Sequence, residues 1–223
     1  MLIELTSLAQ AISVILACVA VTSGVDAWKR EFIGKRRIEL AEQVLAKFFE
    51  VKDAVAQIRN PWLNAEEGKT RRRGSSETQE ESELLDRGYI AVERYQTKES
   101  VFREFNTLKY RAMASFGTGV EEIFTDTFKA VNSIFVSARM LGTHYWRRET
   151  FTGDRYQQNM EEIRRHEGVI WDIGADNDEV CSALSSVQIR LEQITAPVFK
   201  ESMKSYSILT KPWGRSGSPS KDA

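Results

Sequence analysis

The sequence IGKRRIELAEQVLAKFFEVKDAVAQI, from Ile33 to Ile58, carries the clearest helical pattern in the chain. Its large apolar residues recur at spacings of three and four: Leu40, Val44, Phe48, Val51, Val55 and Ile58. This period places them along one side of an α-helix, with charged residues on the other side. Asn60-Pro61 follows and predicts the end of the helix, because the residue before a proline avoids the helical conformation. We therefore expect one long amphipathic helix whose apolar face packs against other helices.

Upstream of this helix lies an uncharged run of 21 residues, LTSLAQAISVILACVAVTSGV, from Leu5 to Val25. At about 1.5 Å per residue, a helix of this length spans roughly 30 Å, the thickness of the hydrocarbon core of a bilayer. A cleaved secretory signal or a lipoprotein signal at Cys18 would need a basic start, and MLIEL supplies an acidic residue instead. We expect a transmembrane anchor over residues 1–28. A buried core helix is the alternative.

The flank that follows this run is aromatic and basic. Five basic residues stand there against Glu31 alone. Basic residues beside a membrane span stay in the cytoplasm, so we expect the amino terminus outside and the rest of the chain inside the bacterial inner membrane. The lipid bilayer is thus the first expected partner. The residues expected at its headgroups are Trp28, Lys29, Arg30, Lys35, Arg36 and Arg37.

Downstream, three more long segments have helical periodicity, and a short helix is expected between the last two. Residues 60–80 lack it and predict an exposed loop, after which Ser76 or Thr78 can cap a helix that runs to about Phe116. Gly117-Thr118-Gly119 predicts a tight turn into a helix from Val120 to about Trp146. A short helix is expected near 157–167, and Asp178 can cap a last helix that Pro197 kinks or restarts.

These segments predict an all-α fold, in which an N-terminal transmembrane helix is followed by an antiparallel bundle of about four long helices. The bundle is expected to occupy residues 29–206. The Gly-, Ser- and Pro-rich residues 207–223 predict a disordered tail.

Composition excludes several classes of function. Lys and Arg number 31 against 32 Asp and Glu, so the chain lacks the basic excess of a dedicated nucleic-acid binder. Two cysteines and two histidines are too few for a disulfide framework, a Cys-rich zinc site or a haem-attachment motif. We expect no nucleic acid and no cofactor.

One aromatic and basic cluster could bind a ligand. A nucleobase or an anion could stack on its rings and pair with its cations, although basic residues also stabilise a helix carboxyl terminus and the aromatic rings can complete a core. The cluster consists of His144, Tyr145, Trp146, Arg147 and Arg148.

Three further groups are weaker candidates. Glu162 and His166 lie four apart but lack the repeated Glu-x-x-His motifs of a helical di-iron site. The acidic stretch with Asp172, Asp176, Asp178 and Glu179 departs from a calcium loop and fits a turn followed by a helix cap. Glutamates surround the basic tripeptide Arg71-Arg72-Arg73 and cancel its field. We expect no metal site in these groups.

Two segments carry a resemblance to known sequences: FIGKRRIELAEQVLAKFFEVKDAVAQIRNP and the later RYQTKESVFREFNTLKYRAMASFG. They resemble uncharacterised bacterial proteins that have one N-terminal membrane helix and a helical cytosolic domain. The resemblance implies a place in the inner membrane and implies no activity, substrate or catalytic residue.

No phosphate-binding loop, nucleophile elbow or zinc-protease helix is visible in the sequence. Catalytic groups from distant helices would leave no local trace, so the absence of a motif does not decide whether the protein is an enzyme. We expect a noncatalytic interaction or scaffold module tethered to the membrane, with an unidentified protein or a second copy of the chain as its partner. The alternative is a ligand-binding or catalytic bundle with a pocket near residues 144–148.

Overall fold

The computed structural model describes residues 2–147, 155–174 and 177–202, without the side chains of residues 2–9, 11, 12, 26, 27, 155, 201 and 202. Every regular element in these ranges is helical, which confirms the predicted all-α class. The helices are α1 (Leu2–Ile58), α2 (Gln79–Thr107), α3 (Lys109–Phe116), the 3₁₀ turn η1 (Thr118–Val120), α4 (Glu121–Met140), the π-helical turn η2 (Leu141–Tyr145), α5 (Arg155–Ile170) and α6 (Glu179–Ser202).

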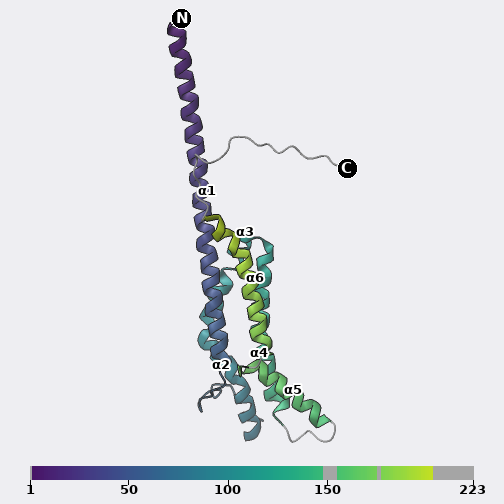
Figure 1. Cartoon of the computed structure of the whole chain (residues 1–223). Helices are drawn as coiled ribbons and strands as arrows, with labels where there is room; N and C mark the ends of the chain where they lie inside the picture. The colour runs from purple at the N-terminus through teal and green to yellow at the C-terminus, as the bar shows by residue number, and fades with distance from the viewer. Residues whose placement is uncertain (1, 148–154, 175–176, 203–223) are drawn as a thin grey trace, which may run out of the picture.

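Four of these helices form an antiparallel bundle. Helices α2 and α6 both pack along α1, and α4 packs against α2 and α6, so α4 lies diagonally opposite α1. The chain runs down α1, up α2 and α3, down α4 and up α6, while α5 packs on α4 and η2 at the lower end (Figure 1). The predicted helical bundle is therefore confirmed.

The core is built on the apolar stripe of α1. The six large apolar residues of this stripe, from Leu40 to Ile58, are all buried. The Phe48 ring lies 6.0 Å from that of Phe105 on α2, which stacks at 4.6 Å on Phe124 of α4. Aromatic stacking thus joins three helices across the bundle.

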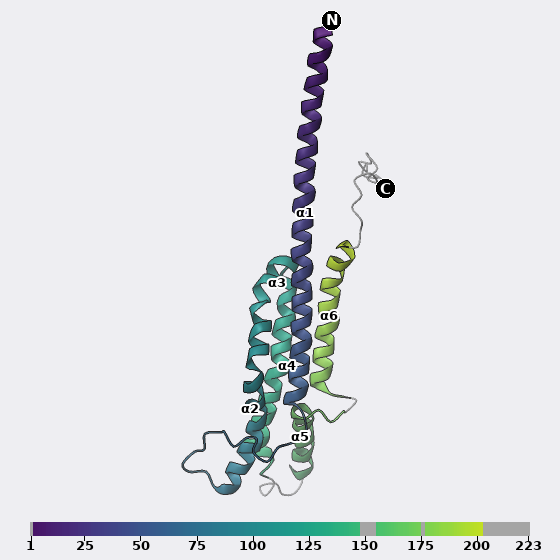
Figure 2. The same ribbon diagram turned by 90° about the vertical axis from the view of Figure 1, so that its left-hand side faces the viewer.

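Helix α1 is much longer than the bundle that it enters. Its carboxyl-terminal part lies among α2, α4 and α6, whereas its amino-terminal part projects alone beyond them (Figure 2). Every described side chain from Gln10 to Ile33 is exposed. One continuous helix therefore has two different environments.

Two predicted helices are interrupted. The helix expected to reach Phe116 breaks at Leu108, and α3 then continues to Gly117, whose φ of 94° favours glycine. The helix expected from Val120 to Trp146 ends as an α-helix at Met140 and widens into η2, where Gly142 meets Gly88 of α2. A Cβ on Gly88 would lie 2.8 Å from the Ala138 carbonyl oxygen, so this helix crossing requires glycine.

Two helix caps that were predicted from the sequence are confirmed, at Thr78 and at Asp178. The Thr78 hydroxyl accepts from the Glu81 amide, and the Glu81 carboxylate accepts from the Thr78 amide, which completes a capping box. The Asp178 carboxylate accepts from the Cys181 amide at 2.9 Å and caps α6. Pro197 lies inside α6, which continues to Ser202 as one α-helix without a restart.

In the part of the chain that the structure describes, no helix combines the length and the apolar character needed to cross a membrane, so the transmembrane segment predicted over residues 1–28 is not supported there. The predicted disordered tail, residues 207–223, lies outside the described residues.

Candidate functional site

The basic flank of α1 forms an exposed ladder of aromatic and cationic side chains. The rings of Trp28 and Phe32 stack at 5.7 Å, and the Arg36 guanidinium lies 4.8 Å from the centre of the Phe32 ring. Lys29, Arg30 and Lys35 are exposed, and Arg37 is half-buried where the helix approaches the bundle. This surface has the aromatic and basic chemistry of groups that lie at a membrane interface.

Above this flank, α1 exposes only uncharged side chains among those described. The exposed fractions of its larger apolar residues lie between 44% and 66%: Val14, Ile15, Leu16, Val19, Val21 and Val25. The Thr22 hydroxyl donates to the Cys18 carbonyl at 3.0 Å, one turn back along the helix. The polar side chain therefore finds its partner within the helix and does not depend on water.

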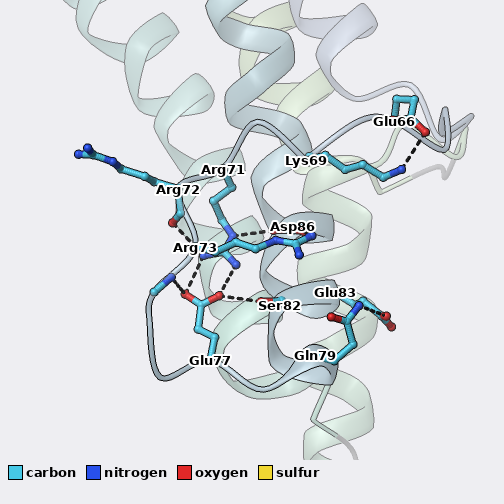
Figure 3. Close-up of polar contacts among 12 residues, drawn as sticks. Glu66, Lys69, Arg71, Arg72, Arg73, Glu77, Gln79, Ser82, Glu83 and Asp86 are labelled. Carbon is cyan, nitrogen blue, oxygen red and sulfur yellow. Dashed lines mark hydrogen bonds and ion pairs between the residues drawn. The ribbon is translucent and has the colours of Figure 1, made fainter.

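At the other end of the bundle, the loop between α1 and α2 is held by ion pairs (Figure 3). Asp86 of α2 accepts from Arg71 Nε at 2.8 Å and from Arg73 Nη2 at 2.7 Å. Glu77 accepts from both terminal nitrogens of Arg71, and these bonds lower the pKa of Glu77 to about 2. Arg72 is exposed and points away from these carboxylates. An anion at the tripeptide would have to displace Glu77 and Asp86.

Arg94 of α2 fastens the start of the same loop. Its guanidinium donates to the carbonyl groups of Ile58, Asn60 and Trp62 and also pairs with Glu67 at 2.8 Å. The end of α1 and the first part of the loop are thereby joined to the middle of α2 by charge-assisted hydrogen bonds.

Arg59, directly after α1, is the largest fully buried side chain, with 1% of its surface exposed. Its guanidinium donates to the carbonyl groups of Gly168 and Val169, at 2.8 and 2.9 Å, and to Asp178 at 2.8 Å. The Trp171 carbonyl accepts a further bond at 3.3 Å. Arg59 thus donates hydrogen bonds to the free carbonyl groups at the end of α5 and links the end of α1 to Asp178, the N-cap of α6.

The acidic stretch near Asp178 binds this arginine. Ligand atoms of Asp172, Asp178 and Cys181 come within 4.8 Å of one another. Burial raises the pKa of Asp178, but the bonds from Arg59 and from the Cys181 amide outweigh it, so the pKa lies below its usual value. Asp178 is therefore already paired with a cation and a helix amino terminus. Asp176 lies outside the described residues, and Glu179 is exposed.

The structure gives the residues of the aromatic and basic cluster separate partners. His144 is exposed, whereas the Tyr145 ring lies 5.3 Å from the His166 ring. Trp146 is buried; its Nε1 donates to Glu167 at 2.8 Å, and the Arg87 guanidinium covers its ring at 4.3 Å. Arg147 pairs with Glu81 at 2.9 Å. Arg148 lies outside the described residues.

His166 lies in the interior between α4 and α5. Its Nδ1 lies 3.0 Å from the Ser137 hydroxyl, and its Nε2 lies 3.8 Å from the Glu162 carboxylate. Burial, and to a smaller extent the nearby Arg165, lowers the pKa of His166. The pair with Glu162 is thus part of a packed helix junction, in which burial disfavours the protonated imidazole.

An open groove of about 410 Å³ lies at the opposite end of α4, with Phe124 and Phe128 among its lining residues. Its two lysines already have ion-pair partners: Lys109 pairs with Glu121, and Lys129 pairs with Asp126, both at 2.9 Å. The groove therefore offers no unpaired charge to recognise a ligand.

Arg59 is not among the residues predicted from the sequence, although the sequence does contain a signal for it. Arg59 follows Val55 by four residues and so continues the apolar stripe, where a cation must either be exposed or find buried partners. The Ser137–His166 contact has no comparable signal, because its two residues are 29 positions apart.

Comparison with protein-family models, curated proteins and solved structures finds no match for this chain, so the resemblance to bacterial membrane-anchored proteins stays a prediction.

Proposed function

We propose that the protein is a noncatalytic helical module anchored in the bacterial inner membrane by the amino-terminal part of α1. The observation that carries this proposal is that α1 projects alone beyond the bundle and that its described side chains there are exposed. The uncharged run in the sequence, residues 5–25, is longer than the part of it whose side chains the structure describes. Its full length matches the hydrocarbon core of a bilayer.

The exposure of this run indicates that something other than this chain's own helices shields its apolar side chains from water. Each large apolar side chain that leaves water contributes roughly 1.5–3 kcal/mol, and a continuous apolar surface of this size is rare on soluble monomers. A buried core helix, the alternative from the sequence, requires neighbours from the same chain. Residues 13–25 have exposed side chains throughout, which disfavours that alternative.

The flank supplies the orientation. Trp28 and the basic residues after it stand between the uncharged run and the bundle, and their exposure leaves them able to meet headgroups. The positive-inside rule then puts the flank and the bundle in the cytoplasm.

The bundle is suited to present a binding surface to a partner protein. Arg59, Arg71 and Arg94 at its lower end are engaged in carboxylate and carbonyl contacts, and both lysines of its groove have ion-pair partners. These features support a scaffold or interaction role over catalysis, with a cytosolic protein or a second copy of the chain as the partner.

Fractionation of cells that express the full chain tests the anchor. We expect the protein to stay with the membranes after an alkaline carbonate wash and to be released by detergent. Leu16→Arg with Val19→Arg should move it to the soluble fraction, because each charge at the centre of a span costs about 2.5–3.5 kcal/mol. Gln43→Arg with Ala46→Arg, in the exposed face beside the bundle, adds the same charge at the same spacing; it is the matched control and should stay in the membrane. Full-length protein that is soluble without detergent would refute the anchor.

A reporter fused after Ala223 tests the orientation. Green fluorescent protein should be fluorescent in that position, and alkaline phosphatase should be inactive, because both outcomes require a cytosolic carboxyl end. Periplasmic phosphatase activity would overturn the orientation while leaving the anchor intact.

A further inference from the structure

The side of α1 that faces away from the bundle has no cover among the described residues. Figure 2 views the bundle from this side, and no described helix lies in front of α1 there. Exposed residues recur along this side at alternating spacings of three and four, the pattern by which one helix packs along another in a coiled coil. This row, which we call the outer seam, consists of Glu39, Glu42, Ala46, Phe49, Asp53 and Ala56.

The centre of the outer seam is apolar. Phe49 exposes 42% of its surface, and Ala46 lies one turn before it on the same side of the helix. Ala56 lies two turns after Phe49. Helices pack closely where large side chains of one face small side chains of the other. A second helix could therefore bury the Phe49 ring and place its own large apolar side chains over the two alanines.

The rest of the outer seam is acidic. Its three carboxylates are exposed, and none of them pairs with another of the described residues. The two lysines beside the seam already have partners. Lys47 pairs with Glu50 at 2.7 Å and with Glu104 at 2.8 Å. Lys52 donates to Gln188 at 2.6 Å. Cations of the described residues therefore leave the carboxylates of the outer seam uncompensated.

We propose that the outer seam binds a basic amphipathic helix of a cytosolic partner protein. The inference rests on the proposed function and names the partner surface of that module. Apolar side chains of the partner helix cover Phe49 and the two alanines, as in other complexes in which an amphipathic helix is recognised by its apolar face. Lysines or arginines beside that face pair with Glu39, Glu42 and Asp53, because complementary charge selects the partner and speeds its encounter.

The anchor disfavours the two other covers for this surface. With Trp28 at the headgroups, the outer seam lies about 16–42 Å farther along the helix, out of reach of the lipid. A second copy in the same membrane stands parallel to the first, and a symmetric parallel pair brings equal positions together. Glu42 would then face Glu42 of the other copy, and Asp53 would face Asp53, so that like charges oppose the contact.

The test uses the full chain in phosphatidylcholine nanodiscs and three synthetic helical peptides as probes. The peptides share one stripe of leucines and differ only in the residues beside it, which are lysine, glutamine or glutamate. The photoreactive residue p-benzoylphenylalanine replaces either Gln43, which is exposed beside the outer seam, or Val136, which is exposed on α4 across the bundle. Illumination then joins a bound peptide to the chain, and co-elution of the chain with the discs tests the anchor separately.

With the photoreactive residue at position 43, we expect about tenfold more product from the lysine peptide than from the glutamate peptide, because only the lysine peptide complements the carboxylates. The glutamine peptide should give an intermediate yield. At position 136 all three peptides should give equally low yields. High salt should lower the yield of the lysine peptide at position 43, because salt screens exposed charges.

Variants of the outer seam separate its apolar and acidic parts. Phe49→Ala should lower the yield at position 43 about tenfold, since an aromatic side chain at the centre of an interface contributes much of the binding. Glu42→Gln with Asp53→Asn should remove the preference for the lysine peptide. The matched control, Glu80→Gln with Glu161→Gln, removes two exposed carboxylates from α2 and α5 and should preserve that preference.

Equal yields from the lysine and glutamate peptides at position 43 would overturn the basic partner. Equal yields of the lysine peptide at positions 43 and 136 would overturn the outer seam as the site. A product that joins two copies of the chain through position 43, in place of a peptide adduct, would assign the outer seam to a second copy and overturn the inference. A chain that elutes apart from the discs would overturn the anchor, and this result is read independently of the peptide yields.

Discussion

The two halves of α1 belong to one helix and differ in almost everything else. From Leu40 to Ile58 the apolar residues follow a helical period and are buried, whereas from Val14 to Ile33 the larger apolar residues are exposed. The lower half has a charged back, and the run from Leu5 to Val25 has no charge on any side. A one-sided stripe is covered by other helices of the chain, whereas the exposed uncharged run has no cover within the described residues, and we propose that the bilayer covers it.

Truncation should separate the halves most strongly. A fragment that begins at Phe32 keeps the buried stripe and should fold with a cooperative thermal transition. A fragment that begins at Asn60 loses six large core residues, each worth roughly 1.5–3 kcal/mol, more than the total stability of most domains. We expect no cooperative transition by circular dichroism. If the two fragments melt alike, the lower half of α1 is dispensable to the bundle.

Phe48 and Phe49 allow the same comparison within the lower half. Phe48 is fully buried, whereas 42% of the surface of Phe49 is exposed. Phe48→Ala should lower the free energy of unfolding by about 3–5 kcal/mol, because it opens a cavity between α1 and α2. Phe49→Ala should cost much less. Urea unfolding of fragments that begin at Phe32 measures both, and Phe48→Leu supplies a milder variant if Phe48→Ala does not fold. Equal losses at the two positions would contradict the burial of Phe48 against α2.

A buried arginine after the end of α1, Arg59, and an exposed arginine on its flank, Arg36, allow the same comparison for charged side chains. Arg59→Met should cost roughly 3 kcal/mol, since it leaves Asp178 and the carbonyl groups at the end of α5 without their donor. Arg36→Met, on the exposed flank, should leave the free energy of unfolding nearly unchanged. The same urea experiments apply. An Arg59→Met protein as stable as the parent would show that the buried ion pair contributes no net stability.

The smallest effect concerns pH and is confined to the bundle. The pKa of His166 is below 6.5 in the folded state. At a pH between this folded pKa and 6.5, the unfolded chain therefore binds more protons than the folded chain. The stability associated with this histidine is therefore present above pH 6.5 and is lost as the pH falls through the folded pKa. The groups that contact His166 or act on its charge are Ser137, Tyr145, Glu162, Arg165 and Glu179.

His166→Gln should flatten the dependence of urea midpoints on pH below 6.5. The other histidine of the chain, His144, is exposed, so His144→Gln serves as the control and should preserve the slope. An unchanged slope in His166→Gln would assign the acid sensitivity to other groups.

Local signals in the sequence predicted the helices and several of their ends. The spacing of the α1 stripe predicted its buried face, and Thr78 and Asp178 predicted the starts of α2 and α6. These features depend on residues within one or two helical turns, where spacing and hydrogen bonds to nearby amides decide the conformation.

The contacts between distant segments could not be predicted in the same way. Arg59 meets Asp178 across 119 positions, and Arg94 meets Glu67 across 27. The close approach of Gly88 and Gly142 depends on how two helices cross, which neither glycine reveals alone. Such pairs follow from the assembled bundle, and many alternative partners would satisfy the same local chemistry.

Hydrogen–deuterium exchange along α1, measured on the full chain in nanodiscs, tests the central claim that its two halves have different covers. We expect slow exchange over residues 5–25 in the bilayer, fast exchange over 29–37 in the flank, and slow exchange over 40–58 in the bundle, because an uncovered helix opens readily. Fast exchange over 5–37, with protection only over 40–58, would contradict this claim.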